Sequence, residues 1–419
     1  MNPGMEQRRN FRVLWGVQFI STAGLTVVVP LLPFYLETLG VFGEENRWWT
    51  GLSLSAPALT LILASPFWGK IGDRWGRKWM VVRAVFGLCL SMLLMGMAQT
   101  PWLFLLFRLM QGAFGGVVDA AAAFAGSDAP PDKRGRTLGS FQGATAAGSL
   151  AGPLLGGLLA DGYGYRVLFF LMAALTGISG LWAAKALTEP RTGIERKRKP
   201  VPLRQVFAGL WGSRSTRSLI LAGFLAKAGV FGLVVVFAPL VRDLSGSPAY
   251  AATWVGGLQA VTWGATFLGG SWWGKRNDRS SPERNFFFAS LACGVCVGLQ
   301  TAVHHPLWLL PLRLVQGFCF SALLPSVFLK VTRSSPEEVR GSAIGVTNSF
   351  LVLGQIMGSF SAALISGWLS PDAAFLFLGG FFLTGALLMV RLPRHTLSRS
   401  PGLPPLGMEQ AAGGVNRER

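Results

Sequence analysis

Charge is scarce in this sequence. Asp, Glu, Lys and Arg make up 14% of the 419 residues, whereas a soluble globular protein carries roughly 25%. Hydrophobic residues make up 51%, and the mean hydropathy is +0.45. This composition argues against a soluble enzyme or binding domain and indicates helices packed in lipid.

Cysteine and histidine are also few, with four and three copies. Cys293 and Cys296 form a C-x-x-C, but no second ligand pair accompanies them, so we expect free thiols inside a helix. The phosphate-binding pattern G-x-x-x-x-G-K-[ST] is missing, so ATP is not the expected energy source. We therefore expect no metal, no cofactor and no enzymatic activity.

Long apolar runs are abundant. A membrane-spanning helix needs about 20 mostly apolar residues, and twelve segments meet this length. They lie at roughly 12–36, 49–69, 79–98, 101–124, 137–160, 165–187, 217–240, 251–273, 285–303, 306–329, 340–367 and 371–392. The predicted fold is an all-α membrane protein with twelve transmembrane helices.

Basic residues predict the orientation of these spans. The N-terminus, the tail and the loops on their side hold 32 of the 38 Lys and Arg residues. The opposite loops hold only Arg47, Arg166 and Arg242. This asymmetry predicts that both termini are cytoplasmic and that the chain is a multi-pass protein of the cytoplasmic membrane. Because the basic residues lie between apolar runs, the net charge of +19 does not indicate nucleic-acid binding.

The two halves of the chain repeat each other. G-K-I-G-D-R at Gly69–Arg74 matches G-K-R-N-D-R at Gly274–Arg279, and R-L-M-Q-G at Arg108–Gly112 matches R-L-V-Q-G at Arg313–Gly317, both 205 residues apart. Such a repeat suits a transporter whose substrate site lies between two lobes. The predicted units are an N-terminal six-helix lobe, a cytoplasmic linker, a C-terminal six-helix lobe and a disordered cytoplasmic tail, at 1–187, 188–216, 217–394 and 395–419.

Several motifs resemble those of one transporter family. G-K-I-G-D-R-W-G-R-K at Gly69–Lys78 resembles the loop motif of the major facilitator superfamily. A-G-S-L-A-G-P-L-L-G-G at Ala147–Gly157 resembles the fifth-span motif of its drug:proton antiporters, and R-L-M-Q-G resembles their fourth-span motif. The wider stretch Ser65–Lys78 is similar to MdtG-type multidrug efflux proteins.

The resemblance implies a monomeric secondary active transporter that uses the proton gradient to export drugs or amphipathic small molecules by alternating access. Its partners would be a small-molecule substrate, protons and the lipid bilayer. Two alternatives stay open. One is a transporter of a defined anionic metabolite or siderophore, and the other is a non-transporting membrane receptor or enzyme.

The loop motif is a candidate conformational latch. We expect Gly69, Gly72 and Gly76 to form a tight turn and Asp73 to accept hydrogen bonds from the open N-terminus of a neighbouring helix. The alternative is that its basic residues only fix the orientation of the chain. The latch residues are Gly69, Asp73, Arg74, Gly76, Arg77 and Lys78.

The fifth span carries a helix-packing motif. Gly148, Gly152 and Gly156 recur every four residues, so they share one face and permit close helix contact. Pro153 lacks a backbone donor and can bend the helix, and Gly157 completes the motif. In the family that this motif resembles, it accompanies export.

Charges inside spans are costly and therefore candidate functional groups. The resemblance assigns proton coupling to Arg108, with bonding to neighbouring carbonyls as the structural alternative. Asp119 lies 11 residues further on, three helical turns, which places it on a similar face as a second coupling candidate. A fixed ion pair with Lys227 is the alternative for Asp119. Arg108, Lys227 and Arg313 together could make the cavity cationic, which would suit an anionic solute.

Other residues of the expected substrate cavity are polar or aromatic side chains inside spans, which can alternatively bond across helices. The complete expected set is Gln18, Gln111, Gln142, Lys227, Phe231, Arg313, Gln316, Asn348 and Gln355.

Overall fold

The computed structural model describes residues 3–129, 134–189, 203–246, 250–336 and 339–390, and these residues form helices and no strands. The first half contains α1 (Pro3–Thr38), α2 (Gly43–Trp75), α3 (Arg77–Met97), α4 (Pro101–Ala113), α5 (Val117–Asp128), α6 (Arg134–Tyr163) and α7 (Tyr165–Ala186). The second half contains α8 (Leu203–Gly212), α9 (Arg214–Ser245), α10 (Ala251–Arg279), α11 (Pro282–Leu299), α12 (Leu309–Ser334), α13 (Arg340–Trp368) and α14 (Pro371–Val390), with short 3₁₀ turns at Gln300–Ala302 and Pro306–Trp308. The predicted tail and residues 190–202 of the predicted linker lie outside the described residues.

Each predicted span corresponds to one long helix, or in one case to two helices in sequence. By length and apolar composition, 11 segments of the described chain can cross a membrane. Helix α10 is long enough but is less apolar, since Thr253, Gln259, Thr262 and Thr266 interrupt its apolar residues. The count of twelve and the cytoplasmic placement of both termini remain predictions.

The fourth predicted span is not one continuous helix. Helix α4 ends at Ala113 and α5 begins at Val117, because Gly116 has a φ of 90° in the left-handed region that favours glycine. The corresponding helix of the second half, α12, is unbroken from Leu309 to Ser334. The break separates Arg108 from Asp119, so the argument that three helical turns place them on one face is wrong.

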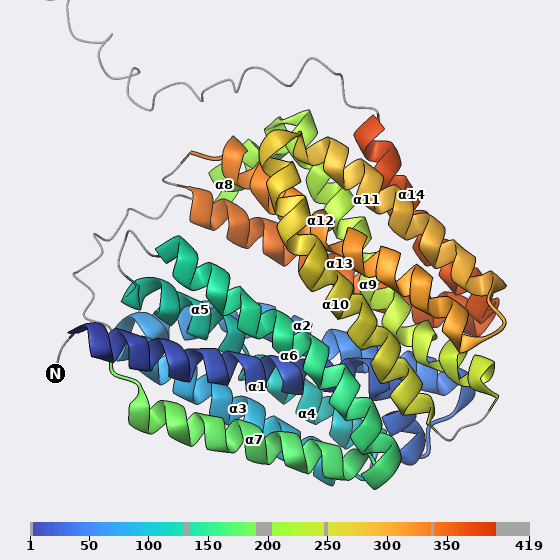
Figure 1. Cartoon of the computed structure of the whole chain (residues 1–419), viewed down its shortest axis with the longest axis horizontal. Helices are drawn as coiled ribbons and strands as arrows, with labels where there is room; N and C mark the ends of the chain where they lie inside the picture. The colour runs from blue at the N-terminus through green and yellow to red at the C-terminus, as the bar shows by residue number, and fades with distance from the viewer. Residues whose placement is uncertain (1–2, 130–133, 190–202, 247–249, 337–338, 391–419) are drawn as a thin grey trace, which may run out of the picture.

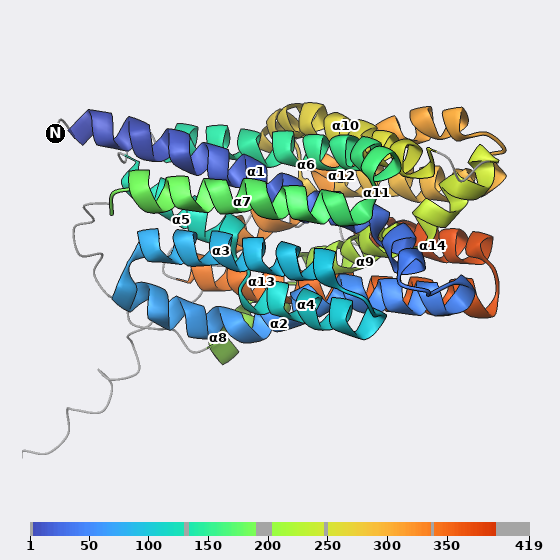
Figure 2. The ribbon, with the colours of Figure 1, turned by 90° about the horizontal axis from the view of Figure 1, so that it is seen from below.

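The two halves form two helical bundles side by side. In Figure 1 their helices converge at the right and spread apart toward the left, where the N-terminus lies. Figure 2 shows that the helices of both bundles run roughly along the long direction of the molecule. Helix α6 packs on α10 and α2 packs on α13, and these two pairs hold the halves together.

Glycines allow the closest helix crossings. A Cβ on Gly148, Gly152 or Gly156 would collide with α1, so the small-residue face of α6 packs within its own half. A Cβ on Gly157 would instead meet the carbonyl oxygen of Ala252 on α10, across the two halves. The motif therefore serves two contacts, one inside the lobe and one between lobes.

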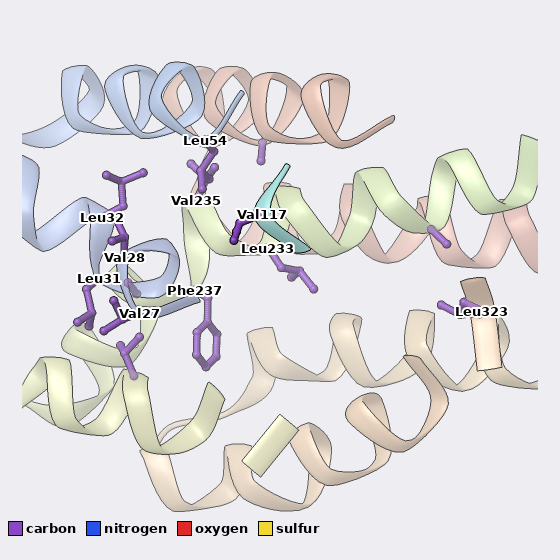
Figure 3. Packing of buried hydrophobic residues seen from close by; sticks show 14 of the residues in the cluster. Val27, Val28, Leu31, Leu32, Leu54, Val117, Leu233, Val235, Phe237 and Leu323 are labelled. Atoms are coloured by element: carbon purple, nitrogen blue, oxygen red, sulfur yellow. The ribbon is translucent and has the colours of Figure 1, made fainter. Parts of the chain in front are cut away.

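The hydrophobic core continues from one half into the other. Figure 3 shows Val27, Leu31 and Leu32 of α1 near Val235 and Phe237 of α9, and all five side chains are buried. Burial of this apolar surface between α1 and α9 packs the two bundles together beside the polar residues described next.

Candidate transport site

Arg108 is held by the first half of the molecule. Its side chain is 4% exposed. The Nε atom donates to the carbonyl oxygen of Ser53 on α2 at 2.9 Å, and Nη1 donates to Oε1 of Gln111 at 2.7 Å. Gln111 lies one turn further along α4, the spacing at which helical side chains meet. The sequence analysis gave bonding to a neighbouring carbonyl as the structural alternative for Arg108, and the bond to Ser53 is a contact of that kind.

Arg313 occupies the equivalent position in the second half but has weaker partners. Its side chain is 3% exposed, and Cζ lies 3.3 Å from the centroid of the Phe237 ring on α9. Nη1 donates to Oε1 of Gln316 at 3.4 Å, and that oxygen also accepts from Nε2 of Gln300 at 3.1 Å. Figure 3 shows the Phe237 ring extending away from α9.

Several buried polar atoms of Ser53 and of the expected cavity residues have no hydrogen-bond partner among the described residues. An unpaired buried polar group costs about 1–3 kcal/mol, so such groups mark places where a polar ligand can bind. The atoms are Nε and Nη2 of Arg313, Nε2 of Gln316, Nε2 of Gln111, Oγ of Ser53 and Oε1 of Gln18. Arg313 therefore offers two buried cationic donors to an incoming acceptor.

Lys227 and Asp119 are not paired with each other. The Nζ atom of Lys227 lies 5.0 Å from the centroid of the Phe231 ring. Asp119 is exposed on α5, just after the break in the fourth span. Within the described part of the chain, neither side chain forms an ion pair. The fixed Asp119–Lys227 ion pair that was the structural alternative is therefore not present.

The remaining expected cavity residues differ in burial. Gln18 is fully buried on α1, and its Nε2 donates to Oγ1 of Thr145 on α6 at 2.8 Å. Gln142 and Asn348 are exposed on α6 and α13, and Gln355 is half-buried. The structure thus groups Arg108 with Gln111 and Arg313 with Gln316, and it places the other polar residues on α1, α6 and α13.

The predicted latch motif has a different local structure from the one expected. Helix α2 continues through Gly69 and Gly72 to Trp75, so only Gly76, with a φ of 92°, makes the turn. The other two glycines are helical, and the prediction of a turn built from all three is wrong. The side chain of Asp73 lies outside the described part of the structure, and Arg74 is exposed.

A carboxylate does cap a helix in this motif, but it comes from Glu189. Its two oxygens accept from the backbone nitrogens of Arg77 at 2.6 Å and of Lys78 at 2.9 Å, at the N-terminus of α3, where a negative charge is favoured. Nη1 of Arg77 also donates to the carbonyl oxygen of Ala123 on α5.

Sequence reasoning missed Arg83, which we counted with the cytoplasmic loop although it lies inside α3. Its Nη1 and Nη2 donate to the carbonyl oxygens of Phe114 and Gly115 at 3.2 and 3.1 Å. Trp68 Nε1 donates to the adjacent carbonyl of Ala113 at 2.6 Å. These three carbonyls lie at the break between α4 and α5. The sequence did contain a signal for Arg83, because this charged residue lies within an apolar run.

Sequence reasoning also missed the polar contacts between the halves. Glu37 on α1 forms an ion pair with Arg242 on α9, with Oε1 and Nη1 2.5 Å apart. Asp161 on α6 accepts from Thr253 on α10. The sequence did contain a signal for this pair, because Glu37 and Arg242 are 205 residues apart and therefore occupy equivalent positions of the two halves. We call the end of the molecule that carries these contacts the external end, after the orientation that the basic residues predict.

Two helical bundles that repeat one another, joined by α6–α10 and α2–α13, with buried basic and amide side chains inside the helices, define a membrane transporter of two lobes. The chain matches the Major Facilitator Superfamily over residues 14–299 and 251–412, and it belongs to that family. It is therefore a multi-pass protein of the cytoplasmic membrane that transports small molecules, not an enzyme.

Individual relatives carry different substrates. The chain is 39% identical to a staphyloferrin B transporter of Staphylococcus aureus (strain NCTC 8325 / PS 47) over 94% of this chain and 96% of that protein. It is 32% identical to the multidrug resistance protein MdtG of Klebsiella pneumoniae (strain 342) over the same shares. The fold is shared with the nucleoside transporter NupG, at a TM-score of 0.77 and 14% identity over 91% of this chain and 99% of that one.

Proposed function

We propose that this transporter exports an anionic small molecule by alternating access. The observation that carries the proposal is that its buried cations have no acidic partners in the described part of the chain. Arg108, Lys227 and Arg313 bond to carbonyls, amides or aromatic rings, and no acidic partner neutralises any of them among the described residues. An uncompensated buried charge is costly, and a bound anion would offset that cost.

The proposal assigns roles within this set. Arg313 binds the anion through Nε and Nη2, which have no other partner in the described chain. Gln111 and Gln316 each retain a free amide donor beside an arginine, and they orient the same ligand. The relative named as a staphyloferrin B transporter supports transport of one defined solute by a protein of this similarity.

We also propose that the proton gradient drives export and that Asp119 carries the coupled proton. Asp119 is the exposed carboxylate of α5, and it lies just after the break between α4 and α5. A coupled proton can bias the inward–outward equilibrium only if the two states bind it with different affinity. In the same proposal the protein acts as a monomer in the lipid bilayer.

A second candidate is proton-coupled efflux of drugs or amphipathic compounds. It is favoured by the similarity to MdtG proteins and by the ring of Phe231 beside Lys227, which gives the interior an aromatic surface. The two candidates differ in the charge of the substrate, so a charge-resolved transport assay separates them.

The test uses inside-out vesicles with a pre-set pH gradient, to which labelled citrate, a neutral sugar and a cationic dye are added in turn. Wild type is compared with Arg313→Gln, Asp119→Asn and the control Arg284→Gln, whose exposed arginine also lies over a phenylalanine ring. Anion uptake that fails only in the first two variants supports the proposal. Proton release by the dye alone, unaffected by Arg313→Gln, would overturn it in favour of drug efflux.

A further inference from the structure

We infer that three charged side chains of the first half, Asp161, Arg47 and Glu37, form a latch that holds the external end of the transporter closed. Each of them contacts the second half and lies at the external end of its helix. The inference concerns the conformational cycle and does not depend on which substrate the protein carries.

Asp161 caps a helix that cannot cap itself. Its Oδ2 accepts from both the backbone nitrogen and Oγ1 of Thr253, each at 2.6 Å. Thr253 lies in the first turn of α10, where backbone N–H groups have no partner within the helix. The residue before α10, Tyr250, has a φ of 65° and provides no side-chain cap. The N-terminus of α10 therefore receives its cap from the opposite half.

Arg47 makes the complementary contact at the other crossing of the halves. Nη1 of Arg47, near the start of α2, donates to the carbonyl oxygen of Ser366, near the end of α13. The last carbonyls of a helix lack partners within the helix and attract positive charge. Gly148 and Gly152 of α6 match Gly354 and Gly358 of α13 at an offset of 206, so the position equivalent to Asp161 is Gly367, next to Ser366.

Glu37 and Arg242 join the halves between these crossings. Their ion pair is 2.5 Å long, and the two side chains are 26% and 34% exposed. Because the two residues are separated by the repeat offset, they are equivalent positions of the two halves that touch each other. Residues related by a pseudo-two-fold axis can touch only near that axis, so this pair lies at the centre of the external end.

These contacts act on the position of the halves and not on the folding of either half. All three join one bundle to the other, and each bundle keeps its own packing if they break. Separation of the external ends removes the cap of α10, the cap of α13 and the ion pair at the same time. The closed external end is therefore favoured by these groups together, and their loss raises the population of the outward-open state.

The test measures the distance between spin labels at the external ends of α6 and α13 by pulsed electron paramagnetic resonance, on the full-length protein in lipid. Tyr163→Cys and Trp368→Cys provide exposed attachment sites. Three native cysteines are buried, so only Cys89 is replaced by serine. Asp161→Ala is the variant, and Asp372→Asn is the control, because Asp372 is an exposed acid in the first turn of α14.

Asp161→Ala is expected to raise the ratio of long to short distances by about two- to fivefold, the effect of losing one partly exposed charged contact. Asp161→Asn, whose oxygen can still cap α10, should raise it less, and Asp372→Asn should leave it unchanged. Equal distance distributions in Asp161→Ala and the control would overturn the role of Asp161.

A charge swap between Glu37 and Arg242 tests the latch without relying on the Asp161 variants. Glu37→Arg places two cations at the centre and should raise the long-distance population, whereas Glu37→Arg combined with Arg242→Glu should return it toward the wild-type value. Glu44→Gln is the control, since Glu44 is exposed at the start of α2. If the single and double variants give the same distribution, the ion pair does not hold the halves and the inference fails.

Discussion

The guanidinium carbon of Arg83 lies 3.7 Å from the centroid of the Trp68 ring, and both side chains donate to the carbonyls where the fourth span breaks. The interruption thus has its own caps, supplied by α2 and α3. In the second half, Trp273 Nε1 donates to the carbonyl oxygen of Phe318 at 3.0 Å, but α12 does not break. The hydrogen bond from a tryptophan to this helix is common to both halves. The hydrogen bonds from Arg83 are made at the break between α4 and α5.

Arg83→Leu should therefore destabilise the fold. It leaves the carbonyls of Phe114 and Gly115 without their donors, at a cost of about 1–3 kcal/mol in the free energy of unfolding. Arg83→Lys should lose less, because one ammonium can reach one of the two oxygens. Arg276→Leu is the control, since its exposed arginine stacks on Trp272 and belongs to no helix break. Denaturant unfolding in detergent measures the differences, and equal losses in Arg83→Leu and Arg276→Leu would contradict the capping role.

The glycine faces give a prediction with a control in the same helix. Gly152→Ala places a Cβ against Oγ1 of Thr26 and the carbonyl oxygen of Ala23, and such overpacking costs about 1–3 kcal/mol. Gly143→Ala meets nothing within 4 Å, so the better helix propensity of alanine should make it neutral or stabilising by up to about 1 kcal/mol. Thermal unfolding should rank the variants in that order, and the reverse order would show that α1 and α6 do not pack as described.

The sequence predicts the helices and the repeat well, because both depend on composition and spacing. Twelve apolar runs and a 205-residue offset identify the bundles before any contact is known. The break at Gly116 could not be found in this way, since an apolar run reads the same whether its backbone is straight or interrupted. The helix cap supplied by Glu189 was missed because its partner, α3, lies more than 100 residues earlier in the chain.

The two equivalent arginines should respond differently when their charge is removed. Arg108→Met leaves the Ser53 carbonyl and the Gln111 oxygen without a donor, so it should destabilise the protein by about 1–3 kcal/mol. Arg313→Met removes a buried charge with two unpaired donors, and replacing such a group by a hydrophobic one can stabilise a protein by about 1–4 kcal/mol. Thermal unfolding with transport assays would show Arg313→Met to be more stable but inactive. Destabilisation by both variants would mean that the contacts of Arg313 with Phe237 and Gln316 outweigh the cost of burying its charge.

Asp119 and Lys227 should act independently, because no ion pair joins them in the described structure. A double-mutant cycle of Asp119→Asn, Lys227→Met and the combination tests this prediction by proton-driven transport and by stability. Effects of groups that do not touch add within about 0.5 kcal/mol, so the double variant should equal the sum of the single variants. Glu283 and Lys330, which do form an ion pair at 2.6 Å, provide the positive control, and Glu283→Gln with Lys330→Met should be non-additive. A coupling at Asp119–Lys227 as large as that of the control pair would show that the two charges meet in another state of the cycle, and Asp119 would then be a partner of Lys227 instead of the carrier of the transported proton.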